Sequence, residues 1–275
     1  MKKQVNNIVG WIALVWLLVG LPACSDEEEM GGYTEVCFTA TLPEDLQTRA
    51  YGEAPSVHRL VVGVFDADKK ELLRKEVEVT GTTIEVPLQL AQGLTYQLLF
   101  WADHGMDSPY DISDFRAIQM KLPTQPVTFE EMQKGDAFFA TVENFNVGVS
   151  PLQTVKLTRP VAQINVGTSA TPLPVTFATS RVPNIFYPFS NTTDGAVDVS
   201  WSFTKISTES FVVEGTTYNY LALGYLFAPA NGGEKIEATL NWTAVDGTME
   251  QSRTFTDVTI EANKRTNIVG NLLMK

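Results

Sequence analysis

Apolar residues recur at alternate positions, or in short unbroken runs, along most of the chain after residue 33. Such runs, separated by Gly, Pro, Asn and Asp, are typical of β-strands rather than of helices. The pattern predicts strands at 59–66, 72–79, 82–90, 94–102, 155–166, 197–203, 218–227, 235–244, 249–255 and 265–273. A further alternating run at 36–41 places Cys37 at a buried or half-buried strand position.

The segments between these runs carry turn signals. Thr80-Gly81 predicts a hairpin between the strands at 72–79 and 82–90, and Asp66-Ala67-Asp68 predicts a hairpin tip. Clear helical periodicity is nearly absent; only 111–120 fits one short helix, with Ser113 as its N-cap.

Strand after strand, with Pro and Gly spread throughout, predicts an all-β fold of sandwiches rather than alternating β/α units. Because 275 residues exceed one ordinary sandwich, we expect two tandem β-sandwich domains with at most one or two short helices. The small, Pro-rich stretch at 167–174 favours a boundary that gives domains at 33–170 and 171–275.

The N-terminus reads as an export signal. Lys2 and Lys3 precede an uncharged apolar run at 8–23, shorter than the roughly 20 residues of a membrane-spanning helix, which predicts a signal peptide at 1–23. Its end, Leu21-Pro22-Ala23-Cys24, resembles a bacterial lipobox, which implies cleavage between Ala23 and Cys24 and acylation of the Cys24 thiol. A plain secreted protein with an incidental cysteine is the alternative, but the basic start, apolar core and terminal Cys together favour the lipoprotein.

An acidic tether at 24–32 follows this cysteine. Its acids and the serine before them are Ser25, Asp26, Glu27, Glu28 and Glu29. By analogy with surface lipoproteins of Bacteroidales they form a surface-export signal; a solvated spacer is the other interpretation, and both stay open.

Charge and cysteine content narrow the function classes. The net charge of −12 becomes −14 once residues 1–23 are removed, which excludes a general nucleic-acid binder because that needs a basic surface. With Cys24 acylated, Cys37 is the one remaining cysteine, so no intrachain disulfide forms and the fold depends on its core.

The sequence offers no catalytic or metal-binding constellation. Its two histidines, His58 and His104, lack the spacing of a zinc site, and Asp103 beside His104 has no nucleophile motif to serve. The acids Asp107, Asp111 and Asp114 are better explained as solvated loop residues than as metal ligands. We therefore predict a non-enzymatic protein with no catalytic residue, no metal and no cofactor.

Several aromatic residues could stack on sugar rings. They are Trp101, Tyr110, Phe115, Tyr187, Phe189, Trp201 and Trp242. Core packing is the favoured interpretation for Trp101 and Trp242, which lie inside predicted strands.

A set of segments in a fixed order resembles the fimbrillin-like lipoproteins of Bacteroidales, the subunits and accessory proteins of type V pili. These segments are Val36–Pro43, Thr48–Ala50, Phe100–Asp103, Tyr110–Asp114, Asp136–Ala140, Leu157–Gly167 and Arg265–Leu273. The resemblance spans nearly the whole chain after the signal peptide. It implies two transthyretin-like sandwiches, no catalysis, a structural or adhesive role in a pilus, and a surface-exposed outer-membrane lipoprotein that is released into a fimbrium upon assembly.

The resemblance also implies an assembly mechanism. A protease cuts after an arginine behind the first strand, the strand leaves, and a strand of another pilus subunit fills the groove. The bond between Arg49 and Ala50 lies where this mechanism needs a cut, in a polar linker. The expected partners are therefore other pilus subunits, the outer membrane through the lipid, and a host or microbial surface ligand or glycan.

Two further expectations remain open. Polymerising shaft subunits carry a surplus C-terminal strand, whereas here the last strand-like run ends at Leu273, so a tip, anchor or accessory role is as plausible as a shaft role. The alternative function is a surface glycan-binding lipoprotein of a nutrient-uptake system, which would also be β-rich, acylated and acid-tagged.

Overall fold

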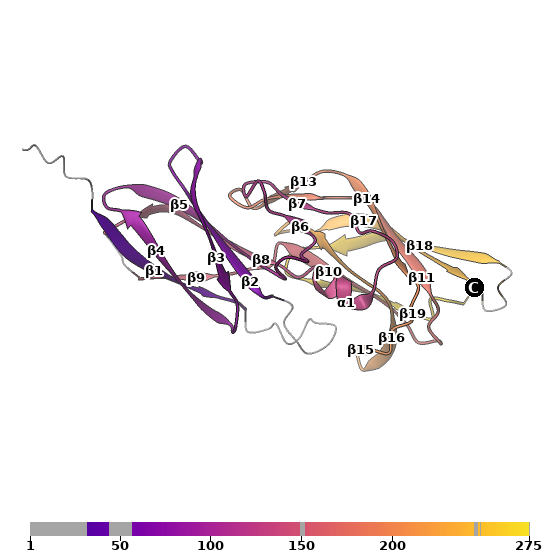
Figure 1. Cartoon of the computed structure of the whole chain (residues 1–275). Coiled ribbons are helices and arrows are strands. Elements are labelled where there is room, and N and C mark those ends of the chain that lie inside the picture. Colours follow the sequence, from indigo (N-terminus) through magenta and orange to yellow (C-terminus); the bar gives the residue numbers. More distant parts are fainter. Residues whose placement is uncertain (1–31, 44–56, 149–151, 245–246, 248, 275) are drawn as a thin grey trace, which may run out of the picture.

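The computed structural model describes residues 32–43, 57–148, 152–244, 247 and 249–274. The molecule is elongated and built almost wholly of strands (Figure 1), which confirms the predicted all-β class. Within this part of the chain, no helix is long and apolar enough to cross a membrane.

Two sheets near the N-terminal end form what we call the first sandwich. One has the order β4-β1-β9 and the other β3-β2-β5-β8. The bounds of these strands are β1 Tyr33–Thr41, β2 Arg59–Phe65, β3 Glu71–Glu78, β4 Thr83–Ala91, β5 Thr95–Asp103, β8 Phe138–Asn146 and β9 Leu152–Lys156. Their facing side chains form one continuous hydrophobic cluster.

The remaining strands form what we call the second sandwich, with the sheets β15-β16-β10-β19 and β14-β11-β17-β18. The bounds are β10 Val161–Thr168, β11 Val175–Val182, β14 Val197–Phe203, β15 Ser210–Val213, β16 Thr216–Phe227, β17 Glu234–Thr243, β18 Glu250–Ile260 and β19 Arg265–Gly270. A small sheet, β13-β12-β7-β6, and one helix, α1 (Phe129–Gln133), belong to the same core. The small-sheet bounds are β6 Tyr110–Asp111, β7 Ile118–Met120, β12 Ile185–Tyr187 and β13 Thr192–Asp194.

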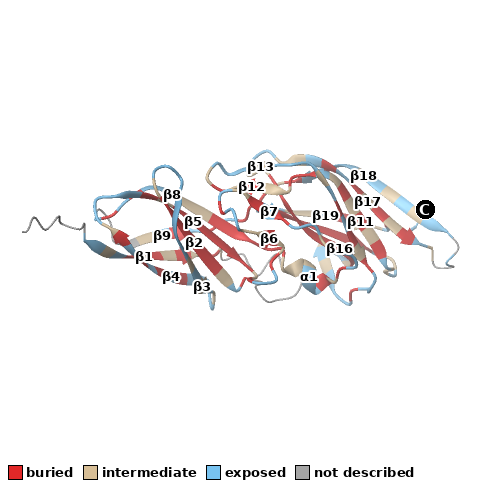
Figure 2. Cartoon of the chain, turned by 45° about the horizontal axis from the view of Figure 1, so that its top comes forward, coloured by how far each residue is buried: buried red, intermediate tan, exposed pale blue. Residues whose placement is uncertain are grey.

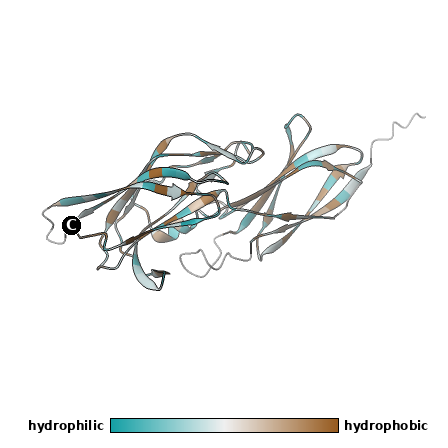
Figure 3. Ribbon diagram, turned by 180° about the vertical axis from the view of Figure 1, so that it is seen from behind, coloured by the Kyte–Doolittle hydropathy of each residue, from teal (hydrophilic) through white to brown (hydrophobic). Residues whose placement is uncertain are grey.

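The alternation that predicts strands is visible along both sandwiches (Figure 3), with buried positions in the strand centres (Figure 2). The continuous apolar runs of β2 and β5 have a separate cause, because their sheet is covered on both faces. Leu98 and Phe100 of β5 face the first core, whereas Leu99 and Trp101 face the second. Gly63 of β2 lets the second core approach closely, since a Cβ there would lie 2.6 Å from the Phe115 ring.

The predicted hairpin around Thr80-Gly81 is wrong. β3 pairs with β2, and β4 pairs with β1 in the opposite sheet. The chain between them crosses the sandwich: the Val79 amide donates to the His58 carbonyl on one sheet, and the Leu42 amide donates to the Thr82 carbonyl on the other. Adjacent runs with a Gly between them do not reveal which sheet each run joins.

The predicted helix at 111–120 is also wrong. β6 and β7 border a turn in which the carboxylates of Asp111 and Asp114 accept hydrogen bonds from the amides of Ser113 and Arg116. These local bonds satisfy the backbone without a helix. The helix lies instead at α1, where Thr128 and Glu131 form a capping box that its Thr-x-x-Glu spacing signals.

The position of β10 bears on the division into domains. Residues 161–168 fall inside the expected first domain (33–170), yet β10 pairs with β16 and β19 of the second sandwich. Pro160 lies between β9 and β10 and separates what the sequence suggested as one strand, since proline has no amide to donate. We propose a division near residue 160.

One edge of the second sandwich is closed by a side chain. The Gln125 amide group donates to the Ser200 carbonyl and accepts from the Ser202 amide of edge strand β14, and the Val127 amide donates to the Ser202 carbonyl at 2.9 Å. Gln125 thus imitates a neighbouring strand. A covered edge cannot template pairing with another chain.

Gln125→Ala should therefore cost about 1 kcal/mol of stability and increase self-association, because β14 regains unpaired backbone groups. Urea unfolding and sedimentation velocity would measure the two effects. Gln119→Ala, at an exposed position on β7, is the matched control and should change neither. A Gln125→Ala protein that stays monomeric at all concentrations would show that the Gln125 side chain does not protect the edge of β14.

Candidate functional site

β1 is the central strand of its sheet. It runs antiparallel to β4 along its whole length, from Tyr33 opposite Ala91 to Thr41 opposite Thr83. Its other edge runs parallel to β9, from Cys37 opposite Leu152 to Thr41 opposite Lys156. Both edges of the strand are therefore hydrogen-bonded to the rest of the first sandwich.

The inward side chains of β1 fill the centre of the first core. Val36, Phe38 and Ala40 are 1%, 0% and 0% exposed. The Phe38 ring lies 5.6 Å from the ring of Phe100 and 5.0 Å from that of Phe145. The groove under β1 thus holds one large aromatic side chain, Phe38, and two residues further on a single buried methyl group, that of Ala40.

The outward side chains make weaker contacts. Cys37 is half-buried on this face, as predicted. Gln89 donates to the Glu35 carboxylate at 3.3 Å, and the Thr41 hydroxyl donates to the Val155 carbonyl at 3.4 Å. Specificity in the groove therefore resides in the apolar inner face.

All of the residues predicted to take part in export and processing lie outside the described residues. These are Ala23, Cys24, Ser25, Asp26, Glu27, Glu28, Glu29, Arg49 and Ala50. The described chain stops at Pro43, two residues beyond β1, and resumes at Val57, two residues before β2. The bond between Arg49 and Ala50 therefore lies between these two strands in the sequence.

Without β1, the first sandwich would present an acceptor groove. The facing edges of β4 and β9 would lose their backbone partners, and the aromatic pocket around Phe100 and Phe145 would open to water. Unpaired edges above an apolar groove bind an extended chain through backbone hydrogen bonds and alternate side chains. The chemistry of this site is therefore binding.

The pair Asp103–His104 has a structural environment. Asp103 is fully buried, and its carboxylate accepts bonds from Arg59 Nε and Nη2 at 2.9 Å each, from Trp101 Nε1 at 3.0 Å and from the Gly105 amide at 2.9 Å. The hydrogen bond to Asp103 raises the pKa of Arg59. Because it accepts four hydrogen bonds, the Asp103 carboxylate stabilises the end of β5.

The loop acids are dispersed. Asp107 accepts a bond from Lys134 Nζ at 3.0 Å, which lowers the pKa of this carboxyl, and the Ser113 amide lowers the pKa of Asp111 in the same way. Across the described ranges, no group of three or more His, Cys, Asp or Glu residues is placed to hold a metal ion.

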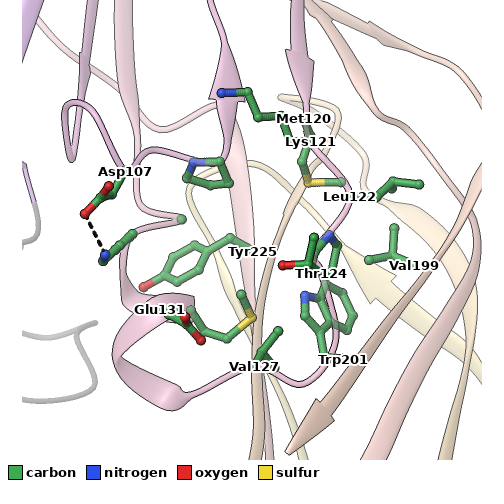
Figure 4. A pocket seen from close by; sticks show the side chains of 15 residues that line it. Asp107, Met120, Lys121, Leu122, Thr124, Val127, Glu131, Val199, Trp201 and Tyr225 are labelled. Atoms are coloured by element: carbon green, nitrogen blue, oxygen red, sulfur yellow. Dashed lines mark hydrogen bonds and ion pairs between the residues drawn. The ribbon is translucent and has the colours of Figure 1, made fainter.

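Apart from the groove under β1, a pocket of about 420 Å³ lies between α1, β14 and the loop after β7 (Figure 4). Trp201 and Tyr225 line it, with the bonded pair Asp107 and Lys134 at one side. Burial raises the pKa of Tyr225, so its phenol stays protonated at neutral pH.

The aromatic residues considered for sugar stacking pack in the interior. Trp101, Tyr110, Phe115, Trp201 and Trp242 are buried, and Tyr187 and Phe189 are half-buried. The Phe189 ring lies 5.2 Å from the ring of Phe65 in an edge-on contact. A glycan-binding surface gains no support from these side chains.

The chain matches one family model over most of its length. A model described as a family of unknown function, DUF6562, matches residues 27–275. No curated protein matches.

Solved structures of similar fold come from Bacteroidales. A candidate adhesin from Bacteroides thetaiotaomicron has a TM-score of 0.57 and 12% identity, with 89% of this chain and 94% of that one covered. A candidate adhesin from Bacteroides ovatus has a TM-score of 0.51 and 14% identity, with 80% and 77% covered. The fimbrial anchor protein Mfa2 from Porphyromonas gingivalis has a TM-score of 0.48 and 16% identity, with 86% and 91% covered. The fold is thus that of the two candidate adhesins from Bacteroides.

Proposed function

The chain belongs to the family of unknown function DUF6562, and we propose that it is a structural or adhesive component of a type V-like pilus, assembled by donor-strand exchange. Its partners in this proposal are other pilus subunits. The fold shared with candidate adhesins supports an adhesive role at the cell surface.

The observation that carries the proposal is the position of β1. It is the first described strand, it lies between β4 and β9, and its inner side chains are fully buried. One linker joins β1 to the other described strands, so a single cut in it would free β1 without disturbing their order. The vacated groove would then offer a strand-sized site.

The export steps are part of the same proposal. Acylation of Cys24 would hold the precursor at the outer membrane, and Ser25 to Glu29 would direct it outward. A cut after Arg49 would release the lipid and β1 together, so the anchor would be temporary.

The C-terminal residues of the second sandwich support the proposal that the chain accepts a strand at its first sandwich. β19 lies in a parallel ladder with β10, and Leu272, just beyond it, is 5% exposed. Arg253 of β18 donates to the carbonyl of Asn271 at 3.1 Å. These residues are committed to their own sandwich, so we propose that the first sandwich receives a strand.

Limited digestion with an arginine-specific protease tests the proposal. We expect one dominant cut after Arg49, release of β1 under mild denaturant, and complexes with other pilus subunits once the denaturant is removed and those subunits are added. Arg49→Gln should block all three steps. Arg116→Gln, at an exposed arginine elsewhere, is the matched control and should block none. A cut protein that loses β1 yet remains monomeric with other pilus subunits present would refute strand exchange.

A further inference from the structure

The fold brings together the chain's two histidines, which lie far apart in the sequence. The rings of His58 and His104 stand 4.9 Å apart between centroids, at an interplanar angle of 67°. His58 precedes β2 and His104 follows β5, as the sequence predicted. Nothing in their spacing revealed that they would meet.

Strand register explains why they meet. β2 and β5 are antiparallel, and their last paired residues are Arg59 and Asp103. One step outward on each strand lie His58 and His104, so they occupy opposed positions on one face. Directly opposed side chains of an antiparallel pair have Cβ atoms about 4.5–5.5 Å apart.

The backbone on both sides of the pair is held firmly. The His58 amide donates to the Asp103 carbonyl at 2.9 Å, and the His58 carbonyl accepts from the Val79 amide at 2.9 Å. On the other strand, the Asp103 carboxylate is fixed by Arg59, Trp101 and Gly105 as described above. Side chains on rigid elements are suited to bind a ligand without a large ordering cost.

We propose that His58 and His104 form a two-imidazole site for a divalent transition-metal ion of the copper, nickel and zinc class. Neutral imidazole is the commonest protein ligand of these ions. Metal–nitrogen bonds of about 2.0–2.1 Å in tetrahedral geometry place the two nitrogens roughly 3.3 Å apart. Each ring centroid lies up to one ring radius behind its coordinating nitrogen, so the two centroids are farther apart than the two nitrogens. The observed 4.9 Å between the centroids of His58 and His104 fits this geometry.

The surroundings favour a cation with open coordination positions. His58 is exposed and His104 half-buried, so solvent reaches the pair. The Asp107 carboxylate lies near His104, and its hydrogen bond from Lys134 is the main cause of its lowered pKa. Since no third protein ligand is in place among the described residues, water completes the coordination shell. The bound ion therefore exchanges readily, and the affinity of the site is highest for copper and lower for nickel and zinc.

A bound ion would tie the start of β2 to the loop after β5. It would stabilise the first sandwich by mass action, because it binds the folded register and not the unfolded chain. This role is independent of strand exchange, since neither histidine lies on β1.

Calorimetric titration of the full chain, made without a histidine tag and stripped with a chelator, tests the site with Cu²⁺, Ni²⁺ and Zn²⁺ separately. We expect one ion per chain, with Cu²⁺ bound most tightly, and a higher melting temperature with metal. His58→Asn and His104→Asn should each weaken binding by more than the roughly tenfold that loss of a supporting group costs. Asp114→Asn, at an exposed carboxylate that pairs with Arg116, is the matched control and should change affinity by less than about threefold.

Spectroscopy identifies the ligands. The electron paramagnetic resonance spectrum of the Cu²⁺ form should show two coupled nitrogens in the parent chain and one in each histidine variant. Circular dichroism with chelator present checks that each variant is folded, and one folded variant suffices. Binding that is equally strong in the histidine variants would place the ion elsewhere and overturn the proposal, as would an absence of binding to the parent chain.

Discussion

Replacing Phe38 by Ala should lower the free energy of unfolding of the first sandwich by about 3–5 kcal/mol, the usual cost of truncating a buried phenylalanine. Phe38 is fully buried at the centre of β1 and contacts the rings of Phe100 and Phe145. The change removes apolar area and leaves a cavity that the surrounding strands cannot close, since both neighbours of β1 are fixed by ladder hydrogen bonds.

Urea unfolding followed by near-ultraviolet circular dichroism would measure the loss. Thr39→Ala, on the half-buried outer face of the same strand, is the matched control and should cost less than about 1 kcal/mol. If the two substitutions cost the same, the aromatic pocket does not hold β1 in place.

The same pocket should govern binding to the groove. After the proposed cut and removal of β1, a peptide with the sequence of residues 33–42 should bind back, because it restores the ladder and fills each position. The peptide with Phe38→Ala should bind at least tenfold more weakly, whereas one with Thr39→Ala should bind almost as well. Fluorescence anisotropy of labelled peptides would measure both affinities.

Local pattern was enough to predict most strands. β14 lies at the residues expected for it, and the apolar runs of β2 and β5 were recognisable although they are buried on both faces. Strands without a clean pattern were missed. β8 and β11, for example, carry polar residues at several positions and resemble loops.

The local sequence pattern could not predict which sheet each strand joins or where the helix lies. Whether β4 pairs with β3 or β1 depends on which faces meet in the assembled core, and a local turn signal contains no such information. The helix was misplaced because a five-residue element is too short to show periodicity, so only the capping box of Thr128 and Glu131 marks it.

The candidate sites differ in the same way. The groove under β1 could be anticipated from an alternating first strand and the family resemblance. The meeting of His58 with His104 could not, because it depends on the register of β2 against β5. Likewise, sequence placed Asp103 beside His104, while the structure pairs it with Arg59.

Asp136→Ala should destabilise the protein by about 3–5 kcal/mol, because it leaves the Arg159 guanidinium buried without its carboxylate. Arg159 Nε and Nη2 donate to the Asp136 carboxylate at 2.8 and 3.1 Å, and the guanidinium lies 4.5 Å from the centre of the Phe138 ring. Both residues are buried. Removing one partner of such a pair costs more than the pair itself contributes.

The location makes this pair a joint between the sandwiches. Asp136 comes just before β8 of the first sandwich, and Arg159 comes just before β10 of the second. Between them, Phe139 and Thr158 exchange two backbone hydrogen bonds, at 2.8 and 2.9 Å. The loss should therefore reach both sandwiches, and the two should unfold at different denaturant concentrations once the joint is broken.

Replacing both partners separates charge burial from lost packing. Asp136→Leu combined with Arg159→Met removes both charges and should recover much of the stability that Asp136→Ala loses, since apolar pairs of similar volume often replace buried ion pairs at little cost. Lys235→Ala, which breaks the exposed pair with Asp257, is the control and should cost less than about 1 kcal/mol. Guanidinium unfolding monitored by tryptophan fluorescence would rank the three proteins. A double variant no more stable than Asp136→Ala would mean that the hydrogen-bond geometry, and not the unpaired charge, holds the joint.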